Sequence, residues 1–187
     1  MSALNTSGRP IVLIGLMGSG KSTVGRELSR RTGLSFLDMD AVIEEQVGAG
    51  IPEIFRDKGE AHFRALETAL LRYIERSVSE GQGAHIISTG GGIVLRPENR
   101  EILRRLGITV WLNVDLPNLM QRTARAQNRP LLQVDDREDT LRRLLAIRSP
   151  LYTQASHLRI NSSGMKVSEV VDVILRHAQK YFKRHRR

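Results

Sequence analysis

Residues 11–22 of the chain read IVLIGLMGSGKS, and this stretch decides the fold. Its second half matches the phosphate-binding loop pattern G-x-x-x-x-G-K-[ST]. The apolar run before the loop predicts a buried strand, and residues 23–28 after it favour a helix. In that context the backbone N–H groups of the loop turn toward phosphate oxygens at a helix N-terminus. The sequence therefore predicts a nucleoside triphosphate site at this turn.

The residue types of the loop suit phosphate and magnesium chemistry. Lys21 supplies a positive charge, and Ser22 supplies a hydroxyl small enough to bind Mg²⁺ beside the phosphates. A glycine-rich turn that only joins a strand to a helix is the alternative, and the Lys-Ser pair argues against it. The predicted nucleotide-binding run is Gly18, Ser19, Gly20, Lys21, Ser22 and Thr23.

Length and composition limit the class of protein. The 187 residues suit one domain, with 40% hydrophobic and 26% charged residues. No run approaches the roughly 18–20 apolar residues of a membrane span, and residues 1–10 lack the pattern of a signal peptide. Because there is no cysteine, disulfides and thiolate metal sites are excluded. We expect one domain over residues 1–187, without membrane contact, in the cytoplasm.

The net charge of +9 raises the possibility of a nucleic-acid partner. The last eight residues carry five positive charges and no acid, so the rest of the chain carries +9 − 5 = +4. We interpret residues 178–187 as a frayed, solvated basic tail, with polyanion binding as the alternative. Only 4% of residues are aromatic, which offers little for base stacking and disfavours nucleic acid.

Strand and helix patterns alternate along the chain and predict an α/β fold. We expect a three-layer sandwich, a parallel sheet of about five strands with helices on both faces. The expected strands are 11–14, 34–37, 85–88, 108–114 and 157–160. The expected helices are 21–32, 41–47, 52–56, 60–79, 97–106, 117–125, 138–148 and 167–182.

Three details of this assignment can be tested directly. Asp40 is the expected N-cap of the helix over 41–47. The Ser149-Pro150 pair is expected to interrupt the helix that begins at residue 138. Residues 126–136 have little periodicity and are expected to form a mobile loop.

Polar and glycine residues follow three of the expected strands. Asp38 and Asp40 close the second strand, and Gly90 to Gly92 close the third. Ligands of parallel sheets collect at the carboxyl ends of the strands, so these residues should face one crevice with the phosphate loop. Two carboxylates there suit an outer partner of Mg²⁺ and a base for an attacking hydroxyl. Strand-end polarity with a helix cap, and an ordinary glycine turn, are the alternatives.

Several arginines could meet anions near this crevice. Arg64 and Glu67 lie three residues apart on one helix face, and Arg148 precedes a proline. A guanidinium grips a carboxylate through two hydrogen bonds, so Arg64 and Arg148 would select an anionic acceptor. Arg129 could reach the γ-phosphate from its loop. A surface ion pair, a solvated helix end and an exposed loop arginine are the alternatives.

Asp115 also ends an apolar strand, as the Mg²⁺-binding acid of many ATPases does. Asp38 already closes a strand, and Leu116-Pro117 reads as the start of a helix, so we favour a helix-entry role for Asp115. No Asn-Lys-x-Asp sequence is present, which disfavours a GTPase.

Taken in order along residues 10–175, six motifs resemble the shikimate kinase family. They are Gly15-x-x-Gly-x-Gly-Lys-Ser22, Asp38-Met-Asp40, Phe63-Arg64-x-x-Glu67, Gly90-Gly-Gly92, Arg129-Pro-Leu-Leu132 and Arg148-Ser-Pro-Leu-Tyr152. The resemblance implies a P-loop NTPase fold of the nucleoside monophosphate kinase type. It implies an ATP- and Mg²⁺-dependent transfer of the γ-phosphoryl group to the 3-hydroxyl of shikimate, in aromatic amino-acid biosynthesis.

The resemblance also implies roles on the acceptor side. Arg64 and Arg148 would bind the substrate carboxylate, and Glu67 would hold Arg64 in place. Asp40 would bind the ring hydroxyls and act as the candidate base. The N–H of Gly91 would donate to the substrate.

On the nucleotide side, Ser22 would bind Mg²⁺ directly and Asp38 through water. Lys21 and the lid arginine Arg129 would stabilise the transferred phosphoryl group, and Arg122 would stack on adenine. Residues 161–164 match the adenine loop of the family only weakly. We expect a monomer whose lid spans about 126–136.

Two rival functions stay open at this point. A gluconate kinase of the same fold also takes an acidic polyol, although two acceptor-side arginines and the glycine triplet favour shikimate. A nucleic-acid-associated ATP-binding protein would instead use the basic tail.

Overall fold

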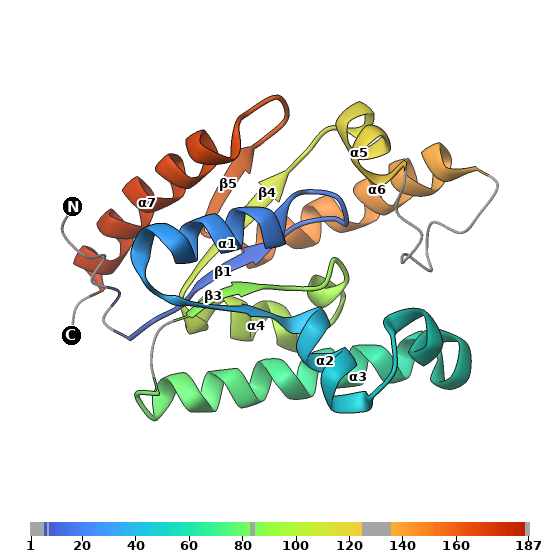
Figure 1. The fold of residues 1–187 in the computed structure, drawn as a ribbon, viewed down its shortest axis with the longest axis horizontal. Coiled ribbons are helices and arrows are strands. Elements are labelled where there is room, and N and C mark those ends of the chain that lie inside the picture. Colours follow the sequence, from blue (N-terminus) through green and yellow to red (C-terminus); the bar gives the residue numbers. More distant parts are fainter. Residues whose placement is uncertain (1–5, 7, 83–84, 125–135, 186–187) are drawn as a thin grey trace.

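The computed structural model describes residues 6, 8–82, 85–124 and 136–185 (Figure 1). They contain a five-stranded parallel sheet in the order β2-β3-β1-β4-β5. The strands are β1 (Ile11–Ile14), β2 (Ser35–Asp38), β3 (His85–Ser88), β4 (Ile108–Asn113) and β5 (Leu158–Asn161). The helices are α1 (Lys21–Thr32), α2 (Met39–Val47), α3 (Ile51–Ser79), the short 3₁₀ helix η1 (Ile93–Leu95), α4 (Pro97–Leu106), α5 (Leu116–Thr123), α6 (Arg137–Ala155) and α7 (Val167–Arg184).

The central strand β1 is buried on both faces because helices cover both sides of the sheet. Ile11 and Leu13 pack with α1 and α7, whereas Val12 and Ile14 pack with α2, α3, α4 and α6. In Figure 1, α1 and α7 accordingly lie apart from α3 and α4, with strands between them. The α/β sandwich predicted from the alternating patterns is confirmed, and each strand begins and ends within one residue of its expected bounds.

The strand order brings the predicted crevice together. Strands β2, β3 and β1 are neighbours, so Asp38, Ser88 and the loop after Ile14 meet at one edge of the sheet. The expected break in α3 is also present, because Gly59 has φ 82° and interrupts the helical backbone.

Asp38, and not Asp40, caps the helix that follows β2. Helix α2 begins at Met39, and the carboxylate of Asp38 accepts a hydrogen bond from the N–H of Asp40 at 3.2 Å. The prediction was wrong by two residues because both acids fit a cap, and the end of β2 determines which one is used. Asp40 therefore lies inside the first helical turn and lines the crevice.

Helix α6 runs through Pro150 to Ala155, contrary to the predicted interruption. Proline removes only one backbone hydrogen bond, and packing of Tyr152 and Ala155 in the core offsets that loss. As a result, Arg148 lies inside a helix and is buried.

The basic tail is also more ordered than expected. Helix α7 continues to Arg184, and Ala178 and Phe182 are buried against the sheet. The charges of the tail predict a frayed end, but Ala178 and Phe182 lie four residues apart on one face of α7. Their burial is enough to keep the last turns helical. None of the described helices combines the length and apolarity needed to cross a bilayer.

Candidate active site

The phosphate loop connects β1 to α1 through three glycines with positive φ: Gly15, Gly18 and Gly20. A Cβ on Gly15 would lie 2.6 Å from the carbonyl oxygen of Leu112, so neighbouring backbone enforces glycine there. Gly20 is the left-handed N-cap of α1, which places the helix N-terminus at the loop. This is the geometry that anions require at a helix N-terminus.

Two side chains of the loop are buried and suited to phosphate. The ammonium group of Lys21 donates to the carbonyl oxygens of Gly15 at 2.9 Å and Leu16 at 3.1 Å. The hydroxyl of Ser19 is buried and has no hydrogen-bond partner among the described residues. A bound triphosphate would satisfy that hydroxyl and would draw Lys21 from the carbonyls, so these residues fit the predicted group.

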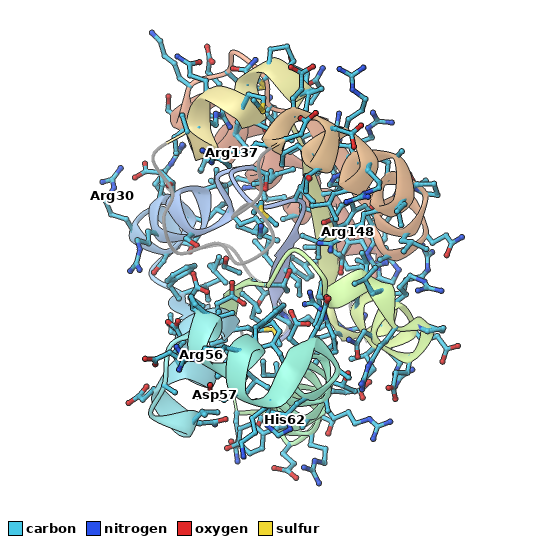
Figure 2. All side chains as sticks on the ribbon, turned by 90° about the vertical axis from the view of Figure 1, so that its right-hand side faces the viewer. Arg30, Arg56, Asp57, His62, Arg137 and Arg148 are labelled. Atoms are coloured by element: carbon cyan, nitrogen blue, oxygen red, sulfur yellow. The ribbon has the colours of Figure 1, made fainter. Side chains whose placement is uncertain are left out.

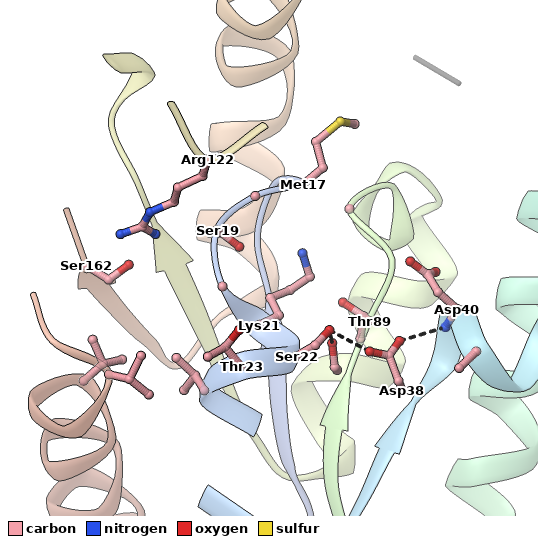
Figure 3. Close-up of a pocket in the computed structure, with 18 of the residues that line it drawn as sticks. Met17, Ser19, Lys21, Ser22, Thr23, Asp38, Asp40, Thr89, Arg122 and Ser162 are labelled. Carbon is pink, nitrogen blue, oxygen red and sulfur yellow. Dashed lines mark hydrogen bonds between the residues drawn. The ribbon is translucent and has the colours of Figure 1, made fainter. Parts of the chain in front are cut away.

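Ser22 and Asp38 fit the predicted magnesium site, in which Ser22 would bind the ion directly and Asp38 would bind it through water. The hydroxyl of Ser22 donates to Oδ2 of Asp38 at 2.6 Å, which leaves the lone pairs of the hydroxyl for a cation. Figure 3 shows Ser22, Asp38 and Asp40 in a row on one side of the loop. The hydroxyl of Ser88 lies 3.3 Å from that of Ser22. Ser88 was not predicted as a site residue; its only signal in the sequence is its place at the end of β3.

Asp115, the alternative acid, serves a different purpose. It caps α5 by accepting hydrogen bonds from the backbone N–H and the side-chain amide of Asn118, at 3.0 and 2.8 Å. These hydrogen bonds lower the pKa of the Asp115 carboxyl, which is exposed. Its helix-entry role is confirmed.

A buried ion cluster lies behind the glycine triplet. Arg64 donates from Nη1 to Oε2 of Glu67 at 2.6 Å, and from Nη2 and Nε to Oε1 of Glu60 at 2.7 and 3.1 Å. Glu67 is fully buried and Arg64 is 8% exposed. Burial raises the pKa of the Glu67 carboxyl although Arg64 opposes that shift, and burial alone would lower the pKa of Arg64, but the two glutamates raise it. This is not a surface ion pair.

The triplet consists of glycines because these charged side chains press against its backbone. A Cβ on Gly90 would lie 2.3 Å from Oε1 of Glu67 and 2.8 Å from Oδ1 of Asp40. A Cβ on Gly92 would lie 2.2 Å from Nη1 of Arg64. A larger residue at either outer position would have to displace these side chains, of which Arg64 and Glu67 are buried and paired with each other. Asp40, Glu67 and Arg64 thus converge on one short segment.

Arg148 and Tyr152 of α6 reach the middle of the triplet from the other side. Both donate to the carbonyl oxygen of Gly91, from Nη1 of Arg148 at 3.1 Å and from the hydroxyl of Tyr152 at 2.6 Å. Arg148 is 4% exposed, and in Figure 2 it lies within the molecule whereas Arg30 projects away. No role was predicted for Tyr152, whose only signal in the sequence is its place in the motif that begins at Arg148.

A cleft of about 1000 Å³ is lined by the phosphate loop, Asp38, Asp40 and Gly91. Arg64 and Arg148 are not among its lining residues; they lie behind the glycine triplet that borders it. Its far end is lined by Arg122, and Figure 3 shows that side chain beside Ser162, across the loop from Asp38. Met165, Val167 and Val170 add an apolar wall that the sequence analysis did not name. Their signal was the start of α7 directly after the weakly matched residues 161–164.

The remaining predicted residue, Arg129, belongs to the segment 125–135, which lies outside the described residues together with most of the expected lid.

Comparison with known proteins gives consistent results. The family model described as "Shikimate kinase" matches residues 17–179. The chain is 42% identical over 172 residues to a shikimate kinase of Xanthomonas euvesicatoria, covering 91% of this chain and 93% of that one. It is 40% identical over 175 residues to a shikimate kinase of Bordetella pertussis, covering 94% and 81%.

Solved structures agree with the sequence matches. The shikimate kinase of Acinetobacter baumannii in complex with shikimate superposes with a TM-score of 0.86 at 41% identity, covering 92% of this chain and 93% of that one. A deoxyadenosine kinase of M. mycoides with bound dCTP shares the fold alone, with a TM-score of 0.59 at 14% identity over 91% of this chain and 99% of that one.

Proposed function

We propose which residues carry out each part of the reaction of this chain, which belongs to the shikimate kinase family. The reaction transfers the γ-phosphoryl group of ATP, with Mg²⁺, to the 3-hydroxyl of shikimate. The observation that carries the proposal is the convergence of Asp40, Arg64 and Arg148 on Gly90 to Gly92, at the edge of the cleft that holds the phosphate loop. We infer that the donor and acceptor groups face each other across the γ-phosphate of bound ATP.

On the donor side, Lys21 leaves the carbonyls of Gly15 and Leu16 and contacts the phosphates, which the N–H groups from Gly18 to Thr23 also bind. Ser22 would hold Mg²⁺ directly and Asp38 through water. When bound, Mg²⁺ neutralises charge on the phosphate oxygens. Arg122 stacks on adenine, which its position at the far end of the cleft supports. Arg129 serves as the lid arginine.

On the acceptor side, Arg64 and Arg148 bind the substrate carboxylate. Arg64 donates three of its N–H groups to Glu60 and Glu67, which leaves two of the five for a carboxylate. Glu67 keeps the guanidinium in place. Asp40 orients the 3-hydroxyl and accepts its proton, and the N–H of Gly91 donates to the substrate. Positioning and charge stabilisation thus account for the catalysis.

We further propose that residues 1–187 act as one kinase domain, as a cytoplasmic monomer that does not bind nucleic acid. The two main apolar clusters lie on opposite faces of one sheet, which supports a single folding unit. Because Ala178 and Phe182 belong to the core, deletion of the basic tail would not test the nucleic-acid rival. Replacing the exposed Lys180, Lys183 and Arg184 with glutamine would, with turnover and polyanion binding measured in parallel.

A coupled ADP-release assay with shikimate, quinate and gluconate tests the function. We expect turnover that depends on shikimate and Mg²⁺, and much slower ADP release with gluconate. Turnover with gluconate but not with shikimate would support the rival small-metabolite kinase and contradict the acceptor assignment.

A further inference from the structure

Tyr152 lies in the best position to control the acceptor side of the site without touching a ligand. It follows Arg148 by four residues on α6, so both side chains project from one helix face. Both reach the same acceptor, the carbonyl oxygen of Gly91. A carbonyl oxygen has two lone pairs, and these two donors match them.

The ring of Tyr152 is fixed by its surroundings. The residue is fully buried, and its ring stacks on that of Trp111 in β4, with centroids 5.5 Å apart and an interplanar angle of 29°. Burial raises the pKa of Tyr152 well above its ordinary value, so the hydroxyl stays protonated and keeps donating. A rigid ring therefore delivers one hydrogen bond to one backbone atom.

That backbone atom belongs to Gly91, the middle residue of the glycine triplet. The carbonyl and the N–H of Gly91 lie in neighbouring peptide planes that share its Cα, and because glycine has little intrinsic φ/ψ preference, contacts from other residues must set both planes. The segment is also close to the phosphate loop, because a Cβ on Gly91 would lie 3.2 Å from the N atom of Met17. Anchoring the carbonyl thus limits where the N–H can point.

We propose that Tyr152 is a positioning residue for the acceptor. Its hydroxyl holds the carbonyl oxygen of Gly91, which it shares with Arg148. The N–H of Gly91 thereby faces the substrate ring, and the guanidinium of Arg148 faces the substrate carboxylate. This inference rests on the proposed function of Arg148 and Gly91. Without the hydroxyl, one of the two lone pairs on the carbonyl oxygen of Gly91 loses its donor. Either that lone pair stays unpaired, or Arg148 shifts to take the place of the hydroxyl and moves away from the substrate carboxylate. Both outcomes weaken shikimate binding.

The test is Tyr152→Phe, with Tyr181→Phe as the matched control. Tyr181 is also on a helix and also donates to a glycine carbonyl, that of Gly107 at 3.2 Å, at the opposite edge of the sheet. We expect Tyr152→Phe to raise the KM for shikimate about ten-fold, with kcat and the KM for ATP within about two-fold of wild type. Tyr181→Phe should leave all three unchanged.

Binding can be followed without turnover, because Trp111 is the sole tryptophan of the chain and stacks on Tyr152. Titration of the Trp111 fluorescence with shikimate should show a ten-fold weaker affinity in Tyr152→Phe. The phenylalanine keeps the aromatic ring beside Trp111. Combining Tyr152→Phe with Arg148→Lys should raise KM by less than the product of the two single effects, since both act through one oxygen.

Kinetics are measured below the lowest melting temperature of the set, so that every variant is folded. An unchanged KM for shikimate, an equal rise in both KM values, or a variant that folds at no temperature would overturn the inference. Wild-type protein inactive with shikimate would instead overturn the proposed function, which keeps the two failures distinct.

Discussion

Arg64 and Glu67 form a buried ion pair, with Nη1 and Oε2 2.6 Å apart and the carboxylate fully shielded from solvent. The same guanidinium also pairs with Glu60, whose side chain is 45% exposed. One arginine thus connects a buried and a solvated carboxylate, and the two partners should differ sharply in their contribution to stability.

We expect Glu67→Ala to lower the free energy of unfolding by about 3–5 kcal/mol, because it leaves a buried guanidinium without its closest partner. Glu60→Ala is the matched control and should lower the free energy of unfolding by less than about 1 kcal/mol, since water replaces the lost carboxylate. Urea denaturation of both variants measures the difference. Equal losses would contradict the role given to burial.

Arg148→Lys should weaken shikimate binding while sparing ATP. The charge is retained, but an ammonium cannot grip a carboxylate through two parallel hydrogen bonds and also reach Gly91. We expect a rise of about ten-fold or more in the KM for shikimate, with the KM for ATP unchanged. Arg142→Lys, on the exposed face of the same helix, is the control and should behave as wild type. Similar damage to both KM values would reject Arg148 as a substrate ligand.

Asp40→Asn should reduce kcat by about 10²- to 10⁴-fold, the range of general base catalysis, while ATP still binds. Steady-state kinetics and nucleotide titration separate the two effects. Glu45→Gln, on the exposed side of α2, supplies a charge-matched control. Near-normal turnover in Asp40→Asn would exclude Asp40 both as base and as orienting group.

Asp38→Asn should raise the Mg²⁺ concentration needed for half-maximal rate by about 10- to 100-fold, because the carboxylate that holds the Ser22 hydroxyl is lost. Asp115→Asn provides the comparison, since this acid also follows a strand but caps α5. Mg²⁺ titrations at constant ATP should leave Asp115→Asn near wild type. If Asp115→Asn raised the half-maximal Mg²⁺ concentration more than Asp38→Asn, Asp115 and not Asp38 would be the acid that binds Mg²⁺.

His157 should make the fold sensitive to mild acid. Its Nδ1 accepts the N–H of Thr109 at 3.1 Å, and burial, with Arg104 nearby, lowers the pKa of His157. The unfolded chain therefore binds more protons, so stability should fall as the pH drops through about 6.5, the ordinary histidine value, toward the lower folded pKa.

His157→Asn keeps an acceptor for Thr109 and does not titrate. Melting temperatures from pH 5 to 8 should fall less steeply on the acid side in this variant than in wild type. His177→Asn, at an exposed position on α7, controls for a general loss of histidine charge. If the melting temperatures of wild type and His157→Asn changed with pH in parallel, His157 would not be the cause of the acid sensitivity.

Much of the fold could be predicted because its signals are local. The apolar runs fixed the five strands to within one residue, and Gly33 ended α1 as expected, with φ 74° and a hydrogen bond from its N–H to the carbonyl of Ser29. The loop over residues 15–22 determined the nucleotide side, since positive φ, lysine and serine are properties of single positions. Asp38, Asp40 and the glycine triplet then met at one edge because parallel strands end together.

The tertiary structure decided what depends on packing between distant segments. Pro150 stays inside α6 because the core holds Tyr152, and Phe182 orders a tail whose charges predict fraying. The outer glycines of the triplet are required by Arg64, Glu67 and Asp40, which come from other elements. The sequence by itself thus determined the phosphate-binding turn. The acceptor side required the fold, because distant segments must bring Arg148 and Tyr152 to the carbonyl oxygen of Gly91 and place the Arg64–Glu67 pair against the triplet.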